Sequence, residues 1–109
     1  MAVTSTQSKA PASVSNVAVG RYITSSTAAA FNITTGFKPR YVKVMNETSG
    51  DQEEWFEGMT DAYAMKKVAA GTTAVITSLG ITPLSYGFTV GLDTDVNVIN
   101  EQLSWVAMG

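Results

Sequence analysis

Three glutamates close together in the sequence, Glu53, Glu54 and Glu57, are the first candidates for chemistry because they flank Trp55. Glycoside hydrolysis needs two carboxyl groups about 5 to 10 Å apart, one of them with its pKa raised by burial. An aromatic ring beside such a pair can stack on a sugar. On a strand, however, Glu53 and Glu57 share a face that water can cover. We therefore expect a solvated acidic edge and assign no catalytic residue.

A second set of oxygen-bearing side chains lies further along the chain. Asp93, Asp95 and Asn97 occupy alternate positions, as the ligands do at the start of a calcium-binding loop. The sixth position of that loop is Val98, where a glycine is needed, and the twelfth is Ser104, where a bidentate glutamate is needed. These departures exclude an EF-hand. The segment therefore predicts a turn, and we expect no metal and no other cofactor.

The residue types that are absent narrow the chemistry further. The 109 residues include no His and no Cys, which excludes Ser-His-Asp and Cys-His catalysis, imidazole or thiolate metal ligation, and disulfides. The net charge of -2 argues against nucleic acid as the main partner, because phosphate neutralisation needs a basic excess. The apolar runs are only a few residues long, so we expect neither a membrane span nor a secretory signal.

The elements that must position these side chains have the pattern of short strands. In residues 40–46, Val42 and Val44 share one face while Lys43 lies on the other, and this period of two fits a half-buried strand. Similar segments occupy residues 22–25, 29–34, 53–59, 72–78, 87–92 and 102–108, with Gly, Pro, Asn and Asp between them. Residues 96–99 follow the turn at the aspartates. The pattern predicts an all-β domain at residues 21–109, an antiparallel β-sandwich that is jelly-roll-like or a partly open barrel.

Residues 60–71 fit two interpretations. Thr60 could cap a helix that Gly71 ends, because several apolar residues between them lie near helical spacing. The same residues also alternate as a strand does, and residues 72–78 beyond the glycine are strand-like. We favour a hairpin that turns at Ala70 and Gly71.

The first 20 residues differ in composition from the rest. Six Ser or Thr and no aromatic residue in positions 1–16 offer too little apolar area to offset the entropy lost on ordering. A flexible terminus is the simpler interpretation, and an extended arm that orders on a neighbouring subunit is the other. Val14, Val17 and Val19 favour the arm, because β-branched residues at near-alternate positions suit a strand or a groove.

Charge is segregated along the sequence. Residues 21–46 contain four basic and no acidic residues, and residues 47–61 contain six acidic and no basic residues. The two groups could lie on neighbouring strands and neutralise each other within one sheet. Alternatively, Arg40 and Lys43 could face Glu53 and Glu57 of the next subunit in a head-to-tail ring.

A resemblance adds to this reading. Its motifs are GFKPRYVKVMNET at residues 36–48, then Trp55, Gly58 and Met59, residues 80–82 and 87–91, Asn97, and residues 105–107. With these motifs the chain resembles small virion proteins of tailed bacteriophages over roughly residues 31–109. The resemblance implies a structural role, as a capsid decoration (cement) protein or as a β-sandwich module of a fibre.

From both lines we expect a decoration protein on the outer capsid surface of the virion, made in the cytoplasm of the bacterial host. It would bind the major capsid protein and other virion proteins as a homo-oligomer, with a trimer favoured. The alternative is a tail- or head-fibre module that binds a host glycan through Trp55 or Tyr63. The expected partner contacts are Val14, Val17, Val19, Arg40, Lys43, Glu53, Trp55 and Glu57.

Overall fold

A computed structural model describes residues 16–24 and 27–109 of the chain. These residues form strands and turns and contain no helix. In chain order the strands are β1 (Val17–Ile23), β2 (Phe31–Thr34), β3 (Tyr41–Asn46), β4 (Gln52–Phe56), β5 (Ala64–Lys67), β6 (Thr73–Ile76), β7 (Ile81–Leu84), β8 (Gly87–Val90) and β9 (Gln102–Met108).

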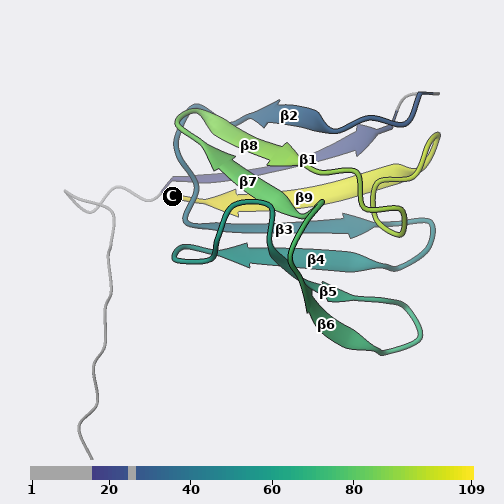
Figure 1. Ribbon diagram of the computed structural model, residues 1–109. Coiled ribbons are helices and arrows are strands. Elements are labelled where there is room, and N and C mark those ends of the chain that lie inside the picture. The colour runs from purple at the N-terminus through teal and green to yellow at the C-terminus, as the bar shows by residue number, and fades with distance from the viewer. Residues whose placement is uncertain (1–15, 25–26) are drawn as a thin grey trace, which may run out of the picture.

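The strands form two antiparallel sheets (Figure 1). The larger sheet has six strands in the order β1-β9-β3-β4-β5-β6, and the smaller has three in the order β2-β8-β7. The two sheets pack together and do not close into a barrel. The predicted all-β antiparallel sandwich is therefore confirmed. The last strand in the sequence, β9, lies between β1 and β3, so the C-terminal segment holds the first strand in the larger sheet.

The core lies between the sheets and follows from the alternation of side chains along each strand. Val42 and Val44 of β3 are fully buried, as their spacing predicts. Phe88 of β8 packs edge-on against Trp105 of β9, with ring centroids 5.5 Å apart. The two sheets are thus joined by apolar and aromatic contacts, which supply most of the free energy of folding in a domain without disulfides.

The segment at residues 60–71 is a turn followed by a hairpin, which confirms the favoured interpretation. Residues 64–67 form β5, which pairs with β6. The Val68 N–H donates to the Thr72 carbonyl over 3.1 Å, and Gly71 turns the chain with a φ of +99°. Only glycine adopts that region at little cost, which is why it suits the turn between β5 and β6.

Two strand assignments from the sequence are corrected. Pro83 is one of the residues expected to separate predicted strands, yet residues 81–84 form β7. This strand lies at an edge of the smaller sheet, where proline's missing N–H costs no hydrogen bond. Residues 96–99 form turns and no strand, because the Asp93 side chain accepts the N–H groups of Asp95 and Val96 and curls the chain locally.

The expected boundary between arm and domain at residue 20 falls inside a strand. Val17 and Val19 belong to β1, which pairs with β9 over its full length, from Val17 opposite Met108 to Ile23 opposite Gln102. Val14 lies outside the described residues. The described part of the predicted arm is therefore mostly part of the sheet.

Candidate functional site

The larger sheet has one face against the smaller sheet and one face directed away from it. We call the second the outer face. By strand register and alternation it consists of Val17, Val19, Arg21 and Ile23 on β1, Gln102, Ser104, Val106 and Met108 on β9, Tyr41, Lys43 and Met45 on β3, Gln52, Glu54 and Phe56 on β4, Met65 and Lys67 on β5, and Thr73 and Val75 on β6.

Exposed apolar side chains gather on this outer face. In the part of the chain that the structure describes, the exposed large hydrophobic residues are Val17, Val19, Ile23, Met45, Phe56, Met65, Val75, Leu79, Tyr86, Ile99 and Met108. All except Leu79, Tyr86 and Ile99 belong to the outer face. Such a concentration of exposed apolar side chains on one face of a small domain indicates a site of interaction with another protein.

Two polar pairs hold side chains in place on the outer face. Arg21 donates to both carboxylate oxygens of Glu47, at 2.9 and 3.0 Å. The Tyr41 hydroxyl donates to the Glu54 carboxylate over 2.6 Å, and burial, together with this carboxylate, raises the pKa of Tyr41 to about 12. Each pair neutralises or occupies a carboxylate that would otherwise oppose burial of the face by a partner.

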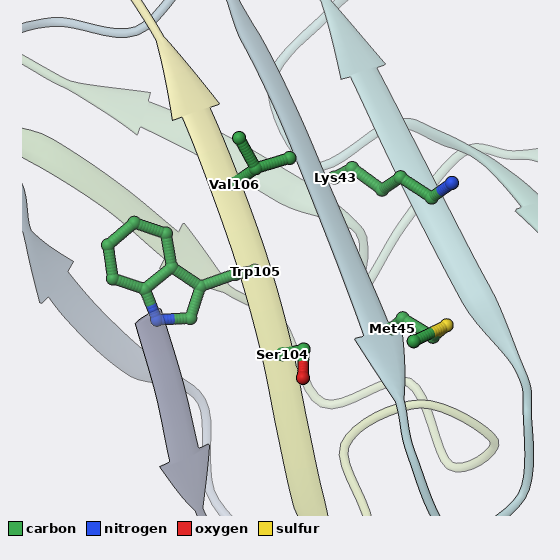
Figure 2. Close-up of a pocket in the computed structure, with 5 residues that line it drawn as sticks. All are labelled: Lys43, Met45, Ser104, Trp105 and Val106. Atoms are coloured by element: carbon green, nitrogen blue, oxygen red, sulfur yellow. The ribbon is translucent and has the colours of Figure 1, made fainter. Parts of the chain in front are cut away.

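The centre of the outer face is hollowed. Figure 2 shows the residues that line a shallow groove of about 230 Å³, with Lys43 and Met45 on β3 beside Ser104, Trp105 and Val106 on β9. The groove is open and mostly apolar, and Lys43 brings a positive charge to one side of it. Such a groove suits an apolar side chain of a partner protein.

The acidic segment differs from its prediction at Glu53. Strand alternation directs Glu53 and Trp55 inward, where both are buried, and leaves Glu54 on the outer face. The expected solvated edge with Glu53 beside Glu57 is therefore wrong, because β4 is an inner strand of the larger sheet with both neighbours in place. The three glutamates do not converge on one site.

The buried carboxyl of Glu53 is unusual because neither of its oxygens has a hydrogen-bond partner. Burial raises the pKa of this carboxyl to about 8, and the negative charge of Asp93 adds to the effect while Lys66 opposes it. A carboxyl with such a pKa is mostly protonated at neutral pH, which avoids an unpaired charge in the core.

Lys66 of β5 connects the sheet to the turn at the aspartates. Its Nζ lies 3.0 Å from Asp93 and 2.5 Å from Asp95. Burial lowers the pKa of Lys66, but the hydrogen bonds and charges of these two aspartates outweigh burial and leave the pKa raised. The Asp93 carboxylate also accepts two backbone N–H groups. In the described residues, no cluster of acidic side chains has the arrangement of a metal site.

Trp55, Arg40 and Glu57, which the sequence predicts as partner contacts, contact other residues of the same chain. Trp55 is only 4% exposed and its indole N–H donates to the Thr60 carbonyl over 3.3 Å, so the ring is not available for stacking on a glycan. Arg40 lies 3.7 Å from Glu57 of the same chain, and the basic strand β3 pairs with the acidic strand β4. The segregated charges therefore meet within one sheet, as the first of the two interpretations expected.

Comparisons with known proteins identify no relative of this chain. No protein-family model matches the chain, and neither the curated proteins nor the solved structures include a significant match. Within the described ranges, no helix has the length and apolar character required to cross a membrane.

Proposed function

We propose that this protein is a structural subunit of a tailed-phage virion, a capsid decoration protein that binds the assembled major capsid lattice through the outer face and stabilises it. The observation that carries the proposal is the concentration of exposed hydrophobic side chains on the outer face. Those side chains cost free energy while they face water, and a partner surface that covers them removes that cost.

Charge indicates which partner surface suits the outer face. Arg21, Lys43 and Lys67 belong to this face, and its acidic side chains are Glu54 and the Glu47 that pairs with Arg21, whereas the whole chain has a net charge of -2. The face is therefore slightly basic on an acidic molecule, with Lys43 and Lys67 as the cations outside that pair. It fits a partner whose exposed surface combines apolar residues with carboxylates.

Binding would stabilise the shell by mass action. A subunit that binds the assembled lattice but not dissociated capsid proteins shifts the equilibrium toward the assembled form. Several contacts made by one oligomer would add avidity without any new contact. The resemblance of residues 31–109 to phage virion proteins supports this assignment. Burial of Trp55 removes one of the two rings, Trp55 and Tyr63, through which the alternative fibre module would bind a glycan.

Cosedimentation with empty shells of the phage tests the proposal. Phe56→Ser removes an aromatic ring that is 44% exposed on the outer face, and Tyr86→Ser removes one that is 48% exposed outside it. We expect saturable binding of the parent, weakened about tenfold by Phe56→Ser, which corresponds to about 1.4 kcal/mol, and unchanged by Tyr86→Ser.

A chain that lacks residues 2–16 tests the arm in the same assay. We expect lower occupancy of the shells with an unchanged fold of the body. No binding by the folded parent protein, or equal loss in Phe56→Ser and Tyr86→Ser, would overturn the assignment of the outer face to lattice binding.

A further inference from the structure

We propose that two copies of this chain associate through antiparallel pairing of β1 with β1, which joins their larger sheets into one continuous sheet. The partner is a second copy of the same chain, related by a two-fold axis at Gly20. This inference does not depend on the proposed function, because it concerns the purified protein alone. It also replaces the trimer that the sequence favoured with a two-fold pair.

The backbone N–H and C=O groups of β1 point alternately toward β9 and toward the open edge of the larger sheet. The Thr24 N–H donates to the Glu101 carbonyl over 3.1 Å, and the Gly109 N–H donates to the Asn16 carbonyl over 2.8 Å. Since alternate residues of an antiparallel strand bond to the same neighbour, Ala18, Gly20 and Tyr22 also direct their N–H and C=O groups toward β9. The remaining residues direct theirs to the open edge: Val17, Val19, Arg21 and Ile23.

Within residues 16–24 and 27–109, which the structure describes, the edge of β1 lacks the features by which proteins protect edges. The other strands at sheet edges, β2, β6 and β7, have only four residues each, and β7 includes Pro83. In contrast, β1 has seven residues, no proline, and Arg21 as its only charged side chain, which Glu47 neutralises. A long apolar edge without such protection is a template for pairing with another strand.

The backbone N–H and C=O groups at the open edge of β1 can pair with the same groups of a second copy of β1. In an antiparallel pair centred on Gly20, Val17 lies opposite Ile23 of the second copy, and Val19 lies opposite its Arg21. All four outward-directed residues then form hydrogen-bonded pairs. A shift by two residues in either direction leaves one of them unpaired, and one such shift places Arg21 opposite Arg21. The centred register is therefore the most favourable.

Side chains also fit this register. On the outer face, Val17, Val19 and Ile23 are 57%, 73% and 65% exposed, and pairing covers part of each. On the inner side, small Ala18 lies opposite Tyr22, and Gly20 lies opposite Gly20, where no side chain competes for space. On the inner side the register therefore brings no two large side chains opposite each other.

The size of the interface sets the expected strength. A strand of seven residues is about 23 Å long. Contact over the width of one strand, about 4.8 Å, covers on each partner an area well below the roughly 1,000 Å² at which stable specific interfaces begin. We therefore expect a micromolar dissociation constant, and an association that a capsid lattice would strengthen by avidity.

Sedimentation velocity of the full chain from about 1 to 200 µM tests the association. Val19→Pro removes one N–H of the open edge without removing a bond to β9, and Val19→Thr is its matched control. We expect the parent and Val19→Thr to dimerise in the same range and Val19→Pro to weaken the dimer at least tenfold. Urea unfolding of each variant shows whether the fold is kept. A parent protein that stays monomeric at 200 µM would overturn the proposal.

Disulfide trapping tests the register, and the absence of Cys in the chain makes the result unambiguous. Val17→Cys and Ile23→Cys chains, mixed under mild oxidation, should form a crosslinked heterodimer, because paired Cα atoms lie about 5.5 Å apart. Val17→Cys alone should not crosslink, since its two sulfurs would be about 20 Å apart. Crosslinking of Val17→Cys alone, or none in the mixture, would contradict pairing at Gly20 and indicate another contact, such as β1 against β6.

Discussion

Glu53 and Lys66 lie directly opposite each other on β4 and β5, yet no hydrogen bond joins their side chains. Lys66 binds Asp93 and Asp95 instead, at the turn that follows β8. The charge of the lysine is therefore already neutralised, and the buried Glu53 carboxyl is left without a partner. The free energy of unfolding therefore depends on whether the Glu53 carboxyl is protonated.

The first prediction concerns the pH dependence of stability. The pKa of Glu53 is about 8 in the folded chain, above the ordinary value of 4.5. Between these two values the unfolded chain loses a proton that the folded chain keeps. The contribution of Glu53 to the free energy of unfolding therefore falls by about 1.4 kcal/mol per pH unit as pH rises, and it levels off above about pH 8.

Glu53→Gln removes this slope because the amide does not ionise. We expect the variant to be about as stable as the parent near pH 4.5 and more stable than it at pH 8, by urea denaturation at both values. Glu54→Gln, on the opposite side of the same strand, is the matched control and should keep the pH dependence of the parent. An unchanged slope in Glu53→Gln would mean that this carboxyl does not control it.

A second prediction follows from the bond between Lys66 and Asp93. Lys66→Met keeps the apolar stem but removes the charge, so the Asp93 carboxylate, only 7% exposed as a residue, is left without its cation. We expect a loss of about 3 kcal/mol in the free energy of unfolding. Lys67→Met, the neighbouring change on the outer face, should cost less than about 0.5 kcal/mol.

A double variant isolates the pair. Asp93→Asn in the Lys66→Met background removes the buried charge, so it should cost less there than in the parent. Equal costs of Asp93→Asn in the two backgrounds would show that the two side chains do not stabilise each other.

The third prediction concerns Asn46, which is fully buried at the end of β3. Its amide group donates to the Val96 carbonyl and to Glu101, and its oxygen accepts the N–H groups of Thr48 and Ser49. Asn46→Ala leaves these groups without a partner in the interior. We expect a loss of about 3 kcal/mol, measured from the urea midpoint at constant m-value.

Asn32 provides the control for that loss. It is exposed on β2 and its side chain accepts one hydrogen bond, from Thr89. Asn32→Ala should cost less than about 1 kcal/mol, since water can replace the lost partner. Similar losses of stability in Asn46→Ala and Asn32→Ala would refute the conclusion that the hydrogen bonds of Asn46 to residues 96–101 stabilise the fold.

The fourth prediction concerns the contact between Gly20 and Trp105. A Cβ at position 20 would lie 2.6 Å from the indole ring, which also packs against Phe88. Gly20→Ala therefore displaces a core side chain and should cost about 1 to 3 kcal/mol by thermal or urea unfolding. In a Trp105→Leu background the cost should become much smaller. A cost that persists there would point to the backbone and not to the ring.

Much of the fold follows from local pattern. The alternation of Val42 and Val44 predicts a half-buried strand because period two is a property of the backbone itself. Gly71 predicts a turn because its conformation depends on the residue more than on distant neighbours. For the same reason the hairpin of β5 and β6 could be predicted, whereas β7 could not, since the tolerance of Pro83 depends on its place at a sheet edge.

The sequence by itself determined that this chain is an all-β domain without His or Cys chemistry, and it indicated which residues alternate on each strand. Only the tertiary structure decided which side of each strand faces the core. Glu53 and Trp55 are inside and Glu54 is outside because β4 has neighbours on both edges and the smaller sheet packs against the same layer. Likewise, Lys66 meets Asp93 across 27 residues of chain. Such contacts depend on strand order and sheet packing, which are properties of the whole chain and not of any local pattern.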